Sequence, residues 1–546
     1  MLDLSLNQRD LRQFTPEQLQ AAFFSAYATS SERISAVEAL LRSPAGGLLR
    51  DRIGRWVILR LPAEELVPDR YTQWRPLVQD AMLFMFLHLS IERLAPKLVE
   101  QMELPSNTPT GARLLKLIAK VPGLQKLGQV LARNRHLHPR LRRALTELEN
   151  GISDMAAEQV RAIIATELGR HLEDNAVKVK HDIFFEASVS AVVRFTWWNP
   201  DTARRERGVF KVMKPYIPAC FAEDMDLLAQ LAKYIGLKHR KYGFAKRVLP
   251  ETFSDVRRLL QHEVDFPREQ ATLLEASRIY GSMIGVRVPR LIRPLCTSKV
   301  TAMTEQRGKK VTNAVAHMPE WCRARVSKLL IEAFLAVPIF SSERDAMFHA
   351  DPHAGNLLYD KGSGNLAILD WALTERVSRE ERRHLAMLFL LTTLRDPDGI
   401  FGQIQALSRG GQRRKRSQAK IVRDCVENFI TQLPLTRIPG GADALGLLED
   451  IAMKGVRLPA PLIMLRKVLF TLDGVQHDIG DPEVNMISIL ARHATQRWLT
   501  SWKAFGSPLS LKDWLAVQSS TLFYGSRVCW QGAQGLLGRS LSVLSA

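Results

Sequence analysis

The sequence has few cysteines and no long apolar run. Its five cysteines are scattered and form no C-x-x-C pair, so they indicate neither a disulfide framework nor a thiolate zinc site. No apolar stretch reaches the roughly 18–20 residues that a membrane-spanning helix needs, and we expect the best candidate, residues 81–89, to be a buried helix. Residues 1–8 lack the features of a signal peptide. These absences together predict a cytoplasmic protein.

Acidic residues are also scarce relative to basic ones. The chain has 76 Lys and Arg against 56 Asp and Glu, a net charge of +20. Such a surplus implies an anionic partner, which could be nucleic acid, acidic lipid or a phosphate-rich ligand. The sequence contains no nucleic-acid recognition motif, so that alternative ranks last and we expect no nucleic-acid partner.

The length of 546 residues predicts two to four structural units. Helical spacing of apolar residues dominates to about residue 182, and strand patterns begin at about Ile183. We expect strands at 190–198, 208–213, 288–291 and 300–303, and helices at 221–234 and 251–280. Beyond 318 the chain again reads as helical, except for a hairpin in which 356–360 and 366–370 flank a glycine-rich turn.

The segment HADPHAGN at 349–356 is the most informative stretch of the sequence. A kinase catalytic loop reads H-R-D-x-x-x-x-N, in which the Asp orients the nucleophile and the Asn holds Mg²⁺. Asp351 and Asn356 have that spacing, and the predicted hairpin ends on Asp370, where a kinase places its second metal-binding carboxylate. Upstream, Lys211 lies in the middle of a predicted strand, like the lysine that reaches the α- and β-phosphates. Glu269 is the candidate carboxylate to hold that lysine.

At this point the sequence resembles the UbiB/AarF family of atypical kinases. Residues 349–356 are similar to the family's H-A-D-x-H-P-G-N loop, and 126–129 match its K-x-G-Q motif. Residues 263–265 resemble its E-x-D motif, and 458–467 resemble its C-terminal helical segment. The resemblance spans about 115–480, with the motifs in the family's order.

The resemblance implies an α+β, two-lobed protein-kinase-like fold with a large helical N-terminal extension. The expected units are an extension at 1–110, a K-x-G-Q segment at 111–182, an N-lobe at 183–305, a C-lobe at 306–482 and a basic, tryptophan-bearing tail at 483–546.

The resemblance also implies ATP and Mg²⁺ as ligands. Asp351, Lys211 and Glu269 would be catalytic, and Asn356 and Asp370 would hold the metal. In the family the K-x-G-Q helix lies across the active site, so Lys126 and Gln129 would face Glu263 and the nucleotide. The family's alanine-rich phosphate loop corresponds to 185–191, which adds Ala187 and Ser188 to the nucleotide contacts.

For partners, the resemblance implies peripheral association with an anionic membrane lipid surface. It also implies a role in ubiquinone or other prenyl-lipid biosynthesis, with a quinone or prenyl-lipid intermediate or a biosynthetic complex as a further partner.

Two departures from the family pattern favour an alternative function. Glu186 lies near the expected phosphate site, where a carboxylate would repel the nucleotide, and Trp371-Ala372 replaces Phe-Gly after Asp370. Loss of that glycine removes a position that tolerates unusual backbone angles. Both features are typical of a nucleotide-binding pseudokinase scaffold for a membrane-associated complex. A second alternative, a metal hydrolase using His349, His353 and Asp351, lacks a distant ligand cluster.

Overall fold

The computed structural model describes residues 16–44, 46–67, 72, 75–105, 107–118, 121, 155–187, 189–242, 257, 261–408, 412–434, 439–480 and 489. It divides into two compact units. The first contains Met1–Arg268 and Ile292–Thr304, and the second contains Glu269–Leu291 and Glu305–Ala546.

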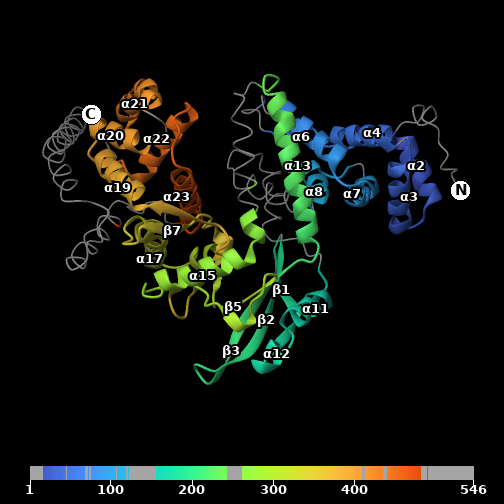
Figure 1. The fold of residues 1–546 in the computed structure, drawn as a ribbon, viewed down its shortest axis with the longest axis horizontal. Coiled ribbons are helices and arrows are strands. Elements are labelled where there is room, and N and C mark those ends of the chain that lie inside the picture. The colour runs from blue at the N-terminus through green and yellow to red at the C-terminus, as the bar shows by residue number, and fades with distance from the viewer. Residues whose placement is uncertain are drawn as a thin grey trace, which may run out of the picture. The chain divides into compact units, whose positions relative to one another are not determined.

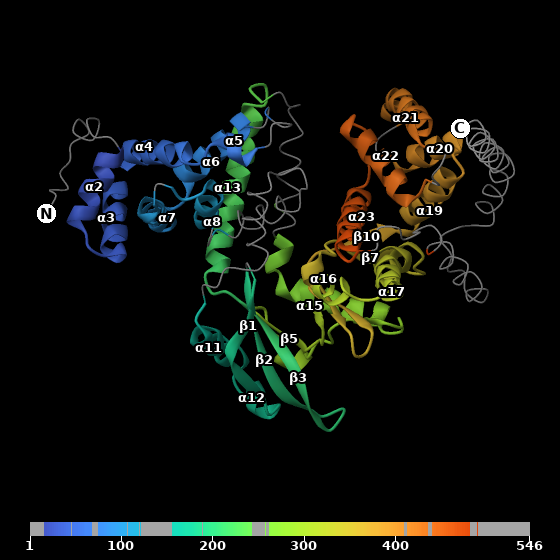
Figure 2. The same cartoon turned by 180° about the vertical axis from the view of Figure 1, so that it is seen from behind.

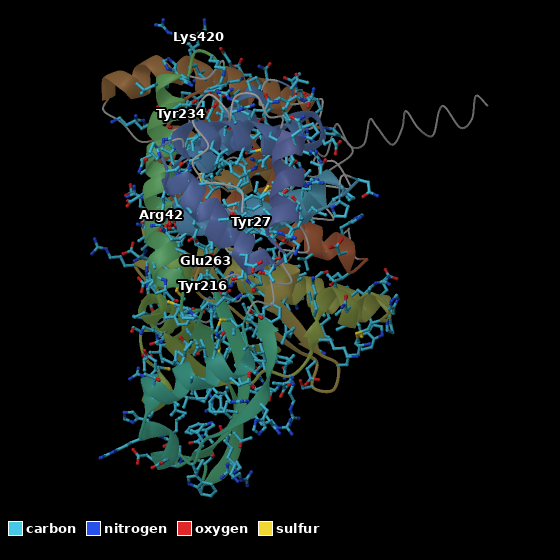
Figure 3. The ribbon with its side chains drawn as sticks, turned by 90° about the vertical axis from the view of Figure 1, so that its right-hand side faces the viewer. Tyr27, Arg42, Tyr216, Tyr234, Glu263 and Lys420 are labelled. Carbon is cyan, nitrogen blue, oxygen red and sulfur yellow. The ribbon has the colours of Figure 1, made fainter. Side chains whose placement is uncertain are left out.

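The first unit opens with a group of helices packed on a long helix, α13 (Ile217–Leu237). Figure 3 shows α13 with Tyr216 just before its first turn and Tyr234 near its other end. Leu227, Leu231 and Ile235 recur at helical spacing on α13 and join the apolar core of the N-terminal helices. These are α2 (Pro16–Ala26), α3 (Ser30–Arg42), α4 (Gly46–Leu59), α5 (Ala63–Leu66), α6 (Arg75–His88), α7 (Ile91–Glu103) and α8 (Thr110–Ile118).

The first unit also holds a four-stranded antiparallel sheet with the order β1-β2-β3-β5. Figure 1 shows α11 and α12 beside this sheet. The alternation of β2 places Ala191, Val193 and Phe195 on the face that packs against α11, while Arg194 lies on the other face. The elements are α11 (Ala157–Leu168), α12 (His171–Asp174), β1 (Lys178–Glu186), β2 (Ser190–Asn199), β3 (Arg204–Met213), the 3₁₀ turn η3 (Arg293–Leu295) and β5 (Val300–Thr304).

The second unit is mostly helical and contains two small sheets. In one, β7 (Asp345–His349) pairs antiparallel with β10 (Thr374–Ser378), and Figure 2 shows α23 (Ala460–Asp478) beside this ribbon. The other has the order β4-β9-β8-β6, with β4 (Val286–Arg287), β6 (Lys309–Lys310), β8 (Leu357–Asp360) and β9 (Asn365–Ile368).

The helices of the second unit surround these sheets. They are α15 (Phe266–Tyr280), whose first turn belongs to the first unit, α16 (Val311–Val315), α17 (Glu320–Ile331), the π-helical turn η4 (Glu332–Ala336), α18 (Val337–Ile339), the 3₁₀ turn η5 (Ala354–Asn356), α19 (Arg379–Thr393), α20 (Pro397–Leu407), α21 (Gln412–Gln432) and α22 (Gly441–Met453).

The expected mixed helix and strand class is confirmed, as are the strands at 190–198 and 300–303 and the hairpin at 356–370. The change to strand expected at Ile183 is wrong, because β1 already begins at Lys178. The register of β1 with β2 is irregular and most β1 side chains are exposed. The sequence therefore lacks the alternation of apolar and polar residues that is typical of a half-buried strand. The strand expected at 288–291 is displaced to β4.

The apolar stretch at 81–89 lies within and just after α6, and Phe84, Met85 and Phe86 are buried in the helical core, as expected. Among the described residues, no helix combines the length and apolar character needed to cross a bilayer.

A partly buried charge cluster ties α7 to α13. Arg93 Nη2 lies 2.8 Å from Asp224 Oδ1, and Arg93 Nη1 lies 3.0 Å from Glu223 Oε2. The Asp224 side chain is only 1% exposed. Since α13 follows β3 directly, this cluster helps to fix the helix that leads out of the strand bearing Lys211.

We expect Arg93→Met to lower the free energy of unfolding by about 3–5 kcal/mol, because it leaves a buried carboxylate without its cation. The matched control is Arg42→Met, which breaks an exposed pair with Glu92 on the same helical group and should cost about 0–1 kcal/mol. Denaturant titration measures both changes. Equal losses in the two variants would contradict the assignment of Arg93 as a structural anchor.

Candidate active site

The catalytic-loop segment begins where β7 ends, on a histidine that is almost completely buried. His349 is 1% exposed. Its ring makes edge contacts with Trp371, at 4.9 Å between ring centroids, and with Phe334, at 5.6 Å. The aromatic packing holds the imidazole in place between Phe334 and Trp371, which lie 37 residues apart in the sequence (371 − 334).

Both nitrogens of this imidazole are used. The backbone N–H of Asp351 donates to His349 Nδ1 at 3.1 Å, and His349 Nε2 lies 2.8 Å from the carbonyl oxygen of Asp370 and 3.2 Å from that of Leu369. Because Nδ1 accepts, the proton must lie on Nε2, which then donates to the carbonyls. Burial lowers the pKa of His349 and favours this neutral form. One ring thus joins the backbone of Asp351 to that of Asp370.

Asn356 is held by the same loop. Its side-chain Nδ2 donates to the backbone carbonyl of Asp351 at 3.2 Å, and its own backbone carbonyl accepts from the N–H of Leu369 at 2.8 Å. Since the amide nitrogen is engaged as a donor, Oδ1 is the atom that this side chain can present as a ligand. The β8–β9 hairpin then returns the chain to Asp370.

Asp370 itself has unusual backbone geometry. Its φ is +51°, in the left-handed region that few non-glycine residues occupy. Trp371 follows with 1% exposure, and its indole Nε1 donates to the carbonyl of Ile368 at 3.2 Å. Ala372 is not among the described residues with positive φ, and its N–H donates to Asp370 Oδ1 at 3.3 Å. The left-handed backbone angle in this segment therefore lies at Asp370, two residues before Ala372.

Helix α15 is anchored to this segment. Thr272 Oγ1 donates to the carbonyl of Trp371 at 2.7 Å, and the ring of Tyr280 lies 5.5 Å from that of Trp371. Glu269, the predicted partner of Lys211, is on the first turns of α15 and is 3% exposed. The buried carboxylate is thus carried on a helix whose next turn contacts the residue after Asp370.

Lys211 lies on β3 in the first unit, as predicted. Its Nζ lies 5.5 Å from the centroid of the Phe266 ring, a cation–π distance. Phe266 precedes Glu269 by three residues, so both project from about the same side of α15. Lys211 belongs to the first unit and Glu269 to the second, and their ion pair stays a prediction.

Glu186 does not present a bare carboxylate to the nucleotide. Its Oε1 lies 2.9 Å from Lys214 Nζ, with side-chain exposures of 5% and 1%, and accepts from the backbone N–H of Met155 at 3.1 Å. Lys214 thus neutralises the charge on which the expected repulsion of phosphates depends, and the repulsion itself stays a prediction. The next residue, Ala187, donates its N–H to the carbonyl of Ser190 at 2.7 Å and so closes the loop.

The remaining predicted site residues are only partly covered. Glu263 is half-buried on the short helical stretch before α15. Lys126, Gln129 and Ser188 lie outside the described residues, so their pairing with Glu263 and the nucleotide stays a prediction.

Three residues that the sequence pattern does not single out contact predicted site residues or their neighbours, each within its own unit. Lys214 neutralises Glu186, Thr272 binds Trp371, and Lys467 Nζ lies 3.9 Å from Asp351 Oδ1. Lys467 was noticed only as the last residue of a helical segment. The sequence around a lysine or threonine does not indicate which distant residue it will contact. The one available signal is that a basic residue, Lys467, ends a segment that resembles the family.

The donor set at this site is small. No group of three or more His, Cys, Asp and Glu with metal-ligand geometry occurs among the described residues. His349 uses both nitrogens within the protein, which removes the metal-hydrolase alternative. The carboxylate of Asp370 and the amide oxygen of Asn356 are hard oxygen ligands, which suit a Mg²⁺ ion that takes its other ligands from phosphates and water.

The fold is of the protein-kinase-like α+β class. Along the chain it has, in the order of a kinase, a strand lysine, a helix with a buried glutamate, a catalytic-loop segment and a hairpin that ends on aspartate. Comparison with known proteins agrees with this class. Residues 147–403 match the family model described as ABC1 atypical kinase-like domain. This segment therefore carries an ABC1 atypical kinase-like domain, and the chain is similar to UbiB/ABC1-like atypical kinases, as the motifs predicted.

Individual relatives are distant. The chain is 25% identical over 419 residues to "Probable protein kinase UbiB" of Xylella fastidiosa strain M23, covering 75% of this chain and 72% of the relative. It is 24% identical over 383 residues to the Arabidopsis thaliana chloroplastic protein ACTIVITY OF BC1 COMPLEX KINASE 7, covering 69% and 52%. A solved structure, the Rv3197–erythromycin complex from Mycobacterium tuberculosis, aligns at 17% identity with a TM-score of 0.43, covering 67% of this chain and 89% of that chain.

The Glu186–Lys214 pair yields a test. We expect Glu186→Gln to lower the free energy of unfolding by about 3–5 kcal/mol, because it removes the negative charge that neutralises the buried Lys214 ammonium. The variant should not bind Mg–ATP more tightly. The double variant Glu186→Gln/Lys214→Met should recover much of that loss, since an apolar replacement leaves no buried charge. Denaturant titration and calorimetry provide the two measurements. Tighter nucleotide binding at unchanged stability would restore the view that Glu186 repels phosphates.

Proposed function

We propose that this protein is a Mg²⁺-dependent, ATP-binding atypical kinase or ATPase. In this proposal it supports ubiquinone or another prenyl-lipid biosynthetic step at a membrane surface. The observation that carries the proposal is the arrangement around His349, which gathers Asp351, Asn356 and Asp370 through backbone and side-chain hydrogen bonds. Two carboxylates and an amide brought together in this way suit the positioning and charge stabilisation that phosphoryl transfer requires.

In the proposed site, Asn356 and Asp370 would hold Mg²⁺, which when bound supplies positive charge for the phosphate oxygens. Asp351 would orient the acceptor and accept its proton. Lys211, steadied by Glu269, would contact the triphosphate, together with Ala187 and Ser188. Lys126, Gln129 and Glu263 would form a gate that keeps protein substrates out.

The biosynthetic role rests on the relatives. Several of them carry the name "Probable protein kinase UbiB". A quinone or prenyl-lipid intermediate, or a biosynthetic complex, is accordingly the proposed partner.

The scaffold alternative loses part of its support, because Glu186 is paired with Lys214. An active enzyme is therefore the better proposal.

Asp370→Asn tests the nucleotide site directly. We expect it to remove the Mg²⁺-dependent part of ATP binding, weakening affinity in Mg²⁺ by about tenfold or more, or about 1.4 kcal/mol. Calorimetric titrations with Mg²⁺ and with EDTA measure this difference. The control is Asp360→Asn in the same hairpin, whose carboxylate accepts from Gly362 and Ser363 in the turn and has no part in the proposed site. Unchanged Mg²⁺ dependence in Asp370→Asn would refute the assignment.

Membrane association is tested with vesicles. The net charge of +20 predicts binding to acidic bilayers, and each basic residue near such a surface adds about 1 kcal/mol. Co-sedimentation should rise when phosphatidylserine is added to phosphatidylcholine vesicles and fall as salt is raised. Binding that ignores both lipid charge and salt, or no binding at all, would count against a peripheral, electrostatic association.

A further inference from the structure

A cation reaches the predicted catalytic aspartate from far beyond the matched domain. Lys467 is on α23, whereas the family match ends at residue 403. Its Nζ lies 3.9 Å from Asp351 Oδ1. The Asp351 side chain is 6% exposed and that of Lys467 is 30% exposed, so the pair is shielded on one side and open on the other.

Packing fixes the place of this lysine. Leu462, Leu465, Leu469 and Leu472 form a buried stripe along α23 at helical spacing. The helix packs against α17, α22 and β10. Because β10 pairs with β7, and β7 ends on His349, α23 is attached to the ribbon that carries the catalytic loop.

The neighbours of the pair show why this lysine matters. His353 Nε2 lies 4.0 Å from Asp351 Oδ2, but a histidine is charged only when protonated. Arg466, the residue before Lys467, forms its ion pair with Glu449 of α22 instead. Lys467 therefore brings an ammonium group to the carboxylate.

We propose that Lys467 is a positioning residue of the active site. In this role its ammonium holds the Asp351 carboxylate in the orientation that receives the acceptor, and offsets the repulsion between that carboxylate and the anionic nucleotide. The catalytic unit then extends beyond the ABC1 domain and includes α23. This inference rests on the proposed ATP-dependent function.

Three variants test the role: Lys467→Met, Lys467→Arg and, as control, Lys328→Met. Lys328 is a partly exposed lysine on α17, paired with Glu332 at the start of η4, and its loss changes the net charge equally. We expect Lys467→Met to lower kcat for ATP hydrolysis by roughly 10²-fold, the scale of losing one preorganised electrostatic group. The Kd for Mg–ATP from calorimetry should change less than about threefold, Lys467→Arg should recover most of kcat, and the control should match wild type.

A second measurement needs no nucleotide. Thermal or denaturant unfolding of Lys467→Met, Asp351→Asn and the double variant forms a double-mutant cycle. Non-additive effects are expected if the two side chains interact in the free protein, and strictly additive effects would overturn the pairing. A Lys467→Met protein that folds and keeps the wild-type kcat would overturn the role alone. A wild type that binds no Mg–ATP would instead overturn the proposed function and this role with it.

Discussion

The candidate active site depends on the hydrogen bonds made by the buried imidazole of His349. It accepts a hydrogen bond from the N–H of Asp351 and donates to the carbonyl of Asp370, so the catalytic loop and the predicted metal-binding segment share one anchor. This works only for a neutral ring with its proton on Nε2, which burial favours by lowering the pKa. A phenylalanine of similar size would preserve the packing but lose both hydrogen bonds, leaving polar backbone groups buried and unpaired. The residue is thus structural, and the chemistry is proposed for its neighbours.

Trp371 connects His349 to the neighbouring helix α15. The indole packs against His349 and Tyr280, while its carbonyl accepts from Thr272 on α15. A bulky residue here fills the core, and the chain meets the geometric demand of the turn by placing Asp370 in the left-handed region. Aspartate tolerates that region better than most residues. The hydrogen bond from Thr272 holds α15, which carries Glu269, to the segment that ends the hairpin.

The local features of this site could be predicted from the sequence, whereas contacts between distant segments could not. The loop at 349–356, the hairpin and the strand around Lys211 follow from spacing and periodicity over a few residues. The pairing of Glu186 could not be predicted because its partner, Lys214, lies beyond the next two strands, and an acid near a phosphate loop looks repulsive until that partner is known. β7 and β10 were missed because each is only five residues long and β7 ends in the functional motif itself, whose polar residues hide a strand pattern.

The same limit explains why the functional unit and the matched domain need not coincide. A family model follows the segments that vary least in spacing, and it ends at residue 403. Helix α23 lies beyond that point in the sequence and still packs against the matched domain. Its apolar stripe must be buried, and it packs in part on β10, the strand that pairs with β7. Once the helix is packed there, Lys467 lies next to a shielded carboxylate, and an ammonium in that place interacts more strongly than it would in open solvent. Helix packing thus creates an electrostatic contact that the catalytic motif does not contain, and the proposed control of Asp351 by α23 follows from that packing.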